Sequence, residues 1–198
     1  MNISRVLLDM RSSQVRRDLS DPYSMHATLM RASAGERVLW RLEPSDTRIQ
    51  SILVAHEQPL NYSNVRDRYP DYLATVETRP LRTENVKAGG VYRFRLTGNP
   101  TVTREGKRYA LSGPADQLLW LSRQGSRCGF SVLGALVSED RFRKGRRHND
   151  DVGRIAFRSV AFDGHLRVED RSVFHEALRM GIGHSKAFGC GMLTLAGL

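Results

Sequence analysis

The chain has 198 residues, of which 40% are hydrophobic and 26% are charged, as in an ordinary globular protein. Its 31 lysines and arginines exceed its 21 aspartates and glutamates, which gives a net charge of +10 with histidine neutral. This composition argues against wholesale disorder, and no stretch reaches the roughly 18 apolar residues of a membrane-spanning helix. The positive charge favours an anionic partner, which is either nucleic acid or an anionic membrane surface.

Two further features bear on the location of the protein. The N-terminus lacks the apolar core and the small-residue cleavage site of a secretion signal. The two cysteines, Cys128 and Cys190, form neither a disulfide framework nor a four-ligand zinc site, and we interpret them as packing residues. We therefore expect a soluble cytoplasmic protein, and the residue spacing predicts no metal site and no cofactor.

The first half of the chain predicts the element order β-α-β-β-α-β. An apolar strand opens the chain at residues 3–10, and Asp21 and Pro22 then suit the N-cap and first turn of a helix that ends at Gly35. The elements that follow are strands at 37–42 and 49–56, a helix at 63–69 and a strand at 75–81. This order is that of a ferredoxin-like unit.

The second half repeats part of this order. Residues 91–96 alternate between apolar and basic, so that one side of the strand packs and the other is cationic. Pro114 opens a helix, for which we predict Leu118, Leu119 and Trp120 on the buried side. The remaining elements are strands at 130–137 and 154–162, a turn at 162–165, a helix at 172–180 and a closing strand from 192.

The strongest local charge lies between the strands at 130–137 and 154–162. The segment RFRKGRR places five cations within seven positions, at a predicted loop. These cations are Arg141, Arg143, Lys144, Arg146 and Arg147. Arginines in such a loop suit an anionic partner, and Arg158 on the returning strand is a further candidate. The alternative interpretation is a solvated basic loop.

A glycine-rich segment precedes the closing strand. It contains Gly181, Gly183, Gly189 and Gly191, with Lys186 between them. Glycines expose backbone N–H groups to an anion, and the lysine adds a positive charge for phosphate. The segment is not a P-loop, because it follows a helix and precedes a strand and lacks the GK[ST] ending. The alternative interpretation is a tight helix-to-strand turn.

This segment resembles the glycine-rich loop of the RAMP superfamily of CRISPR-associated proteins. More narrowly, the chain is similar to the CasE family of endoribonucleases, the crRNA-processing subunits of type I-E Cascade. The resemblance runs from end to end and is carried in order by RRDLSDPYSMH, RVLWRLEP, YRFRLTGNP, PADQLLWL and GIGHSKAFGCG. One departure is His184-Ser185, where relatives have small residues or proline.

The resemblance implies an α+β protein with two tandem ferredoxin-like domains, residues 1–88 and 89–198. It places Tyr23 and His26 in the catalytic positions of the family. It also implies metal-independent cleavage of a CRISPR repeat RNA at the base of its hairpin, giving a 2′,3′-cyclic phosphate and a 5′-hydroxyl. The product crRNA hairpin is then retained, and other Cascade subunits are the protein partners.

The residues suit that chemistry on their own terms. RNA carries its own nucleophile, the 2′-hydroxyl, so the protein must move protons and hold the attack in line. Histidine titrates nearest neutrality, which suits His26 to either proton transfer. Tyr23 lies one turn earlier on the same side and can donate a hydrogen bond to a phosphate oxygen. The alternatives are a surface histidine and a packing tyrosine.

Three other functions compete with this hypothesis. A non-catalytic RNA-binding subunit of a CRISPR ribonucleoprotein is the main rival, but such a subunit has no need for Tyr23 and His26 together. A basic housekeeping RNA-binding protein is disfavoured by the glycine-rich loop. A membrane-surface role lacks a long basic amphipathic helix.

Overall fold

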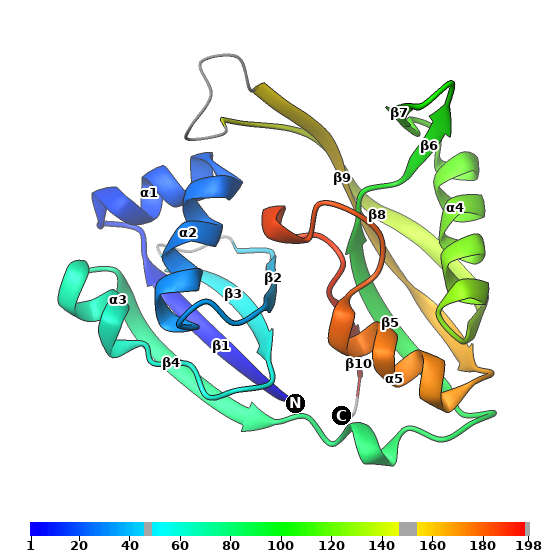
Figure 1. Ribbon diagram of the computed structural model, residues 1–198, viewed down its shortest axis with the longest axis horizontal. Helices are drawn as coiled ribbons and strands as arrows, with labels where there is room; N and C mark the ends of the chain where they lie inside the picture. Colours follow the sequence, from blue (N-terminus) through cyan, green and yellow to red (C-terminus); the bar gives the residue numbers. More distant parts are fainter. Residues whose placement is uncertain (46–48, 147–153, 197–198) are drawn as a thin grey trace. The chain divides into compact units, whose positions relative to one another are not determined.

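The computed structural model describes residues 1–45, 49–146 and 154–196, apart from the side chains of residues 145, 146, 154 and 155. Contacts divide it into two compact units (Figure 1). The first unit consists of Met1–Leu81, Ala187–Gly189 and the chain around Lys144, and the second contains Arg82–Arg143, Ala156–Lys186 and the chain from Cys190. The proposed boundary between independent domains, at residues 88 and 89, stays a prediction.

The first unit contains a four-stranded antiparallel sheet. Its elements are β1 (Asn2–Asp9), α1 (Ser13–Ser20), α2 (Pro22–Ala32), β2 (Val38–Leu42), β3 (Ile49–His56), α3 (Ser63–Arg68) and β4 (Leu73–Pro80). The strand order is β2-β3-β1-β4, with β1 antiparallel to both β3 and β4. This arrangement confirms the predicted ferredoxin-like unit, and α1 is an additional helix that the sequence analysis did not predict.

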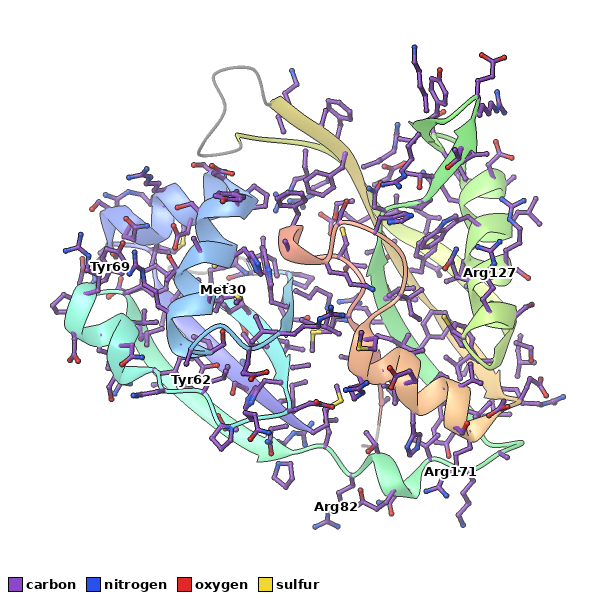
Figure 2. The ribbon with its side chains drawn as sticks, in the orientation of Figure 1. Met30, Tyr62, Tyr69, Arg82, Arg127 and Arg171 are labelled. Carbon is purple, nitrogen blue, oxygen red and sulfur yellow. The ribbon has the colours of Figure 1, made fainter. Side chains whose placement is uncertain are left out.

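The core of the first unit lies between this sheet and α2. Val6 and Leu8, two residues apart on β1, are buried in one cluster with Met25 and Leu29 of α2. Met30, Tyr62 and Tyr69, labelled in Figure 2, are partly buried at the edge of this cluster. The spacings of two residues on the strand and four on the helix place these apolar side chains on the core-facing sides.

The second unit has the same sheet order. Its elements are η1 (Thr83–Asn85), β5 (Val91–Gly98), β6 (Thr101–Arg104), β7 (Lys107–Ala110), α4 (Pro114–Arg127), β8 (Phe130–Arg146), β9 (Arg154–Val168), α5 (Arg171–Met180) and β10 (Leu193–Leu195). The short helix η2 (Lys186–Phe188) lies mostly in the first unit. The sheet runs β10-β5-β9-β8, so the first strand again lies between the third and fourth. The α+β prediction with two ferredoxin-like sheets is therefore confirmed.

Three predictions for the second unit are wrong. Residues 162–165 form no turn, because β9 continues through them and Gly164 pairs with Phe94 of β5. Glycine is required there by packing, since a Cβ would lie 2.7 Å from the Cα of Ala135 on β8. Leu119 is 54% exposed, whereas Trp120 and Leu121 are buried.

The third correction concerns the basic segment. The sequence predicted a loop from residue 141, but β8 continues to Arg146. A long strand is compatible with consecutive cations when its end is exposed to solvent, as Arg141 and Lys144 are. Among the described residues, every helix is too short or too polar to cross a bilayer.

Candidate functional site

The helix α2 carries Tyr23 and His26 and begins where the sequence predicts. The carboxylate of Asp21 accepts a hydrogen bond from the backbone N–H of Tyr23 at 3.0 Å, and Pro22 occupies the first turn. These features stop the helix from extending further toward the N-terminus. Tyr23 and His26 are three residues apart on this helix and both are half-buried. The structure therefore brings the two predicted catalytic residues together on one side of α2.

The surroundings of His26 favour its neutral form. The Nδ1 atom is buried and accepts or donates no hydrogen bond within the described part of the chain. Burial without a partner disfavours the charged imidazolium, and it lowers the pKa of His26 below the ordinary value of 6.5. At neutral pH the free protein therefore presents a neutral imidazole that can take up a proton.

A buried carboxylate holds α2 in place. Asp18 of α1 is 1% exposed, and its Oδ1 atom accepts hydrogen bonds from Ser24 Oγ at 2.6 Å and Gln14 Nε2 at 2.7 Å. Its Oδ2 atom accepts hydrogen bonds from Thr28 Oγ1 at 2.7 Å and Tyr72 Oη at 2.6 Å. Ser24 and Thr28 stand on either side of His26 in the sequence, so this network fixes the helix that presents the imidazole.

The sequence analysis missed Asp18. Asp18 lies in α1, which the sequence did not predict. Three of its four hydrogen-bond partners are too distant in the chain for a local motif to indicate them. Burial and the charge of Asp18 raise the pKa of Tyr72, which keeps that hydroxyl protonated as a donor. The signal available in the sequence was the pair of hydroxyl residues Ser24 and Thr28 at a spacing of four on an otherwise apolar helix.

The four glycines of the glycine-rich segment all have positive φ angles. The angles are 75° for Gly181, 76° for Gly183, 82° for Gly189 and 92° for Gly191. At Gly189, within the first unit, a Cβ would lie 2.9 Å from the ring of Trp40, whose Nε1–H donates to the carbonyl of Ala187 at 3.3 Å. Both the turn geometry and this close packing require glycine, so the structure explains these residues whether or not they contact a ligand.

The cations of the basic segment differ in exposure and in their partners. Arg141 is exposed and forms an ion pair with Glu139. Burial, followed by the charge of Arg141, lowers the pKa of Arg143, but a guanidinium remains protonated. Lys144 is exposed. Arg147 and the side chain of Arg146 lie outside the described residues.

Arg158 is held by an acidic partner. On β9 its Nε donates to Asp140 Oδ1 of β8 at 2.5 Å, and Asp140 also accepts a hydrogen bond from Gln117 Nε2 at 2.8 Å. Desolvation opposes ionisation of Asp140, but the hydrogen bonds from Arg158 and Gln117 outweigh it and lower the pKa of this carboxyl. The ion pair orients Arg158 through Nε and leaves its terminal nitrogens without a partner among the described residues.

Comparisons with known proteins show the family. A family model described as "CRISPR associated protein" matches residues 1–197. The CRISPR-associated endoribonuclease Cse3 of Thermus thermophilus is 33% identical over 214 residues, which cover 99% of this chain and 100% of that protein. The Cascade subunit CasE of Escherichia coli strain K12 is 29% identical over 119 residues, 53% of this chain and 57% of that protein.

A solved structure is similar over nearly the whole chain. Thermus thermophilus Cse3 bound to an RNA that represents a pre-cleavage complex has a TM-score of 0.89 and 32% identity, and the match covers 98% of each chain. The similarity therefore extends through both units. On the sequence match and this structural match, the chain belongs to the family of CRISPR-associated proteins that contains Cse3 and CasE.

Proposed function

We propose that this protein is an endoribonuclease that cleaves CRISPR precursor RNA at the base of the repeat hairpin, without a metal ion, and then retains the crRNA product. The observation that carries the proposal is the pairing of a half-buried, neutral His26 with Tyr23 on the first turns of α2. The relative Cse3 is an endoribonuclease and has been solved with a pre-cleavage RNA, which supports RNA cleavage as the activity.

In the proposed reaction the 2′ oxygen forms a bond to phosphorus as the bond from phosphorus to the 5′ oxygen breaks. His26 takes the proton from the 2′-hydroxyl, because its neutral imidazole is the form that accepts a proton. Tyr23 donates a hydrogen bond to a phosphate oxygen, where negative charge increases in the transition state. The 5′ oxygen takes a proton from water. The products are a 2′,3′-cyclic phosphate and a 5′-hydroxyl.

Binding of the RNA hairpin is assigned to the cations of the second half of the chain. The group comprises Arg141, Arg143, Lys144, Arg146, Arg147, Arg158 and Lys186, with the backbone of Gly181, Gly183, Gly189 and Gly191. Arginine and lysine side chains neutralise phosphates and so bind duplex RNA by its shape and charge rather than by its sequence. The relative CasE is a subunit of Cascade, so we propose other Cascade subunits as protein partners. A cytoplasmic location fits the two free cysteines.

A substrate with 2′-deoxyribose at the cut position tests the reaction. We expect the protein to bind this RNA with its normal affinity and to leave it intact, because the nucleophile is missing. Cleavage of the all-ribose RNA should continue in excess EDTA, because no step of the reaction passes through a metal. Cleavage of the deoxy substrate would show that water attacks the phosphate. Binding without cleavage of either RNA would identify a non-catalytic RNA-binding subunit.

A further inference from the structure

The β6–β7 hairpin of the second unit has no role in the site described above. β6 and β7 pair with each other and form a separate two-stranded sheet, with Arg104 opposite Lys107 and Val102 opposite Tyr109. In Figure 1 the hairpin stands apart from the four-stranded sheet, beyond the end of β5. Glu105 and Gly106 form its turn with φ angles of 49° and 74°, which is the backbone of a tight two-residue hairpin.

One face of this hairpin combines two cations with an aromatic ring. Residues directly opposite each other, and residues two apart on a strand, share a face, so Arg104, Lys107 and Tyr109 lie on the same face. Both cations are exposed and Tyr109 is 50% exposed. Neither cation forms an ion pair within the described ranges, and like charges directly opposite each other destabilise a hairpin. The face therefore carries an unfavourable charge pair that an anionic ligand would relieve.

The base of the hairpin is fixed to the glycine-rich loop. Asn99, which precedes β6, is 6% exposed and donates from Nδ2 to Ser185 Oγ at 2.7 Å. Partial burial, followed by the charges of Arg108 and Lys186, lowers the pKa of His184. The opposite face of the hairpin, which carries Arg108, thus adjoins the loop that the proposed function assigns to RNA. The hairpin therefore adjoins that loop, and its face with Arg104, Lys107 and Tyr109 lies on the side directed away from the loop.

We propose that the β6–β7 hairpin binds single-stranded RNA adjoining the repeat hairpin, with a base stacked on Tyr109 and phosphates held by Arg104 and Lys107. The inference rests on the proposed function and adds to it a second region of substrate. An exposed aromatic ring beside cations is the combination that single-stranded nucleic acid requires, because bases offer flat faces and phosphates offer charge. In a duplex the bases are stacked on each other, so no base is free to lie on Tyr109.

A protein partner is less suited to this face. Stable protein interfaces are depleted in lysine at their centre and built around a desolvated apolar core. Here the two residues beside Tyr109 on its own strand, Arg108 and Ala110, point to the opposite face, and Arg104 and Lys107 occupy the end of the hairpin near the turn. Within the two described strands, the apolar neighbour of Tyr109 on the aromatic face is its cross-strand partner Val102.

Affinity for two RNAs tests this inference. One RNA is the repeat hairpin alone, and the other carries unpaired nucleotides at its 5′ or 3′ side in separate arms. We expect the wild-type protein to bind one of the extended RNAs more tightly, and Tyr109→Ala to weaken that binding about fivefold to hundredfold. The double variant Arg104→Ala/Lys107→Ala should reduce the slope of log affinity against log salt by about 1.4 for the extended RNA, since single strands lose about 0.7 per phosphate contact.

Two controls accompany these variants. Tyr109→Phe keeps the ring and should bind extended RNA like the wild type, and Arg123→Ala removes an exposed arginine of α4 and should leave the salt slope for both RNAs unchanged. Equal wild-type affinity for hairpin and extended RNAs would overturn the inference alone. Equal losses by Tyr109→Ala for both RNAs would also overturn it, because the face would then contact the stem. Wild-type protein that binds no repeat RNA would overturn the proposed function and the inference together.

Discussion

His26 is the residue whose burial sets the proposed chemistry. A half-buried imidazole whose Nδ1 has no partner among the described residues is costly to protonate, so the fold keeps it neutral at physiological pH. Asp18, eight residues earlier, is also buried, but unlike His26 Nδ1 its carboxylate has hydrogen-bond partners. Four donors compensate the carboxylate for its loss of water. One residue is left ready to change protonation state, and the other fixes the helix that presents it.

Replacing His26 by alanine should slow cleavage about 10²- to 10⁴-fold, the range for losing one acid or base group. The affinity for hairpin RNA should change little, because a neutral histidine neutralises no phosphate. Single-turnover cleavage with saturating protein measures the rate, and a filter-binding titration measures the affinity. A variant that cleaves at the wild-type rate would remove His26 from the reaction.

The pH dependence of cleavage follows from the neutral state of His26. Burial lowers the pKa of His26 in the folded protein below 6.5. The neutral imidazole, which is the active form in the proposed reaction, therefore prevails above pH 6.5 and is lost as the pH falls through the lowered pKa. At subsaturating protein the cleavage rate should therefore rise with pH and reach a plateau below neutrality. Bound phosphates favour the imidazolium, so at saturating protein the midpoint should move to higher pH. A rate that falls with rising pH over this range would assign His26 as the acid instead.

At the scale of elements, the contact between α1 and α2 depends on Asp18. Asp18→Asn replaces one acceptor oxygen by an amide that faces hydroxyl donors, and we expect it to lower the free energy of unfolding by about 2 to 4 kcal/mol. Urea denaturation checks this value. Asp67→Asn on α3 is the matched control, because Asp67 is exposed, and it should stay within about 0.5 kcal/mol of the wild type. A loss by Asp18→Asn no larger than that of the control would show that the network is dispensable.

The end of β8 is the element to which hairpin binding is assigned. Replacing Arg143, Lys144, Arg146 and Arg147 by alanine should weaken RNA binding and reduce the slope of log affinity against log salt by about 2 to 4, if three or four of them contact phosphates. Cleavage should partly recover at saturating protein, because Tyr23 and His26 remain. Arg123→Ala/Arg127→Ala on α4 removes two exposed charges as a control. An unchanged slope in the quadruple variant would direct the search for the RNA path to Arg93, Arg95 and Lys186.

At the scale of the whole molecule, the net charge of +10 favours retention of the product. The proposed cleavage at the base of the hairpin would leave the RNA stem intact, so its contacts with the protein would persist after the reaction. With excess RNA at low salt, we expect product to accumulate to about one equivalent of protein and then stop. Raising the salt should restore turnover, because screening weakens phosphate contacts. Many equivalents of product at low salt would contradict retention.

The sequence by itself determined most of the element order. Alternation on β5, the Asp21-Pro22 start of α2 and the apolar spacing of Met25 and Leu29 are local signals, and each predicts its element without knowledge of distant neighbours. The family resemblance, which rests on several motifs in order, likewise required no coordinates. Tyr23 and His26 were placed together by helical spacing alone.

Only the tertiary structure decided the features that depend on distant contacts. The sequence Asp163-Gly164 is typical of a turn, but pairing with β5 and close packing against β8 keep the chain extended there. The partners of Asp18 come from α1, α2 and the turn before β4, and the burial that lowers the pKa of His26 arises from packing around α2. Such contacts join residues that are far apart in the chain, and local sequence patterns therefore do not predict them. For the same reason, the structure showed that Gly189 packs against Trp40, whereas the sequence showed only that a glycine was present.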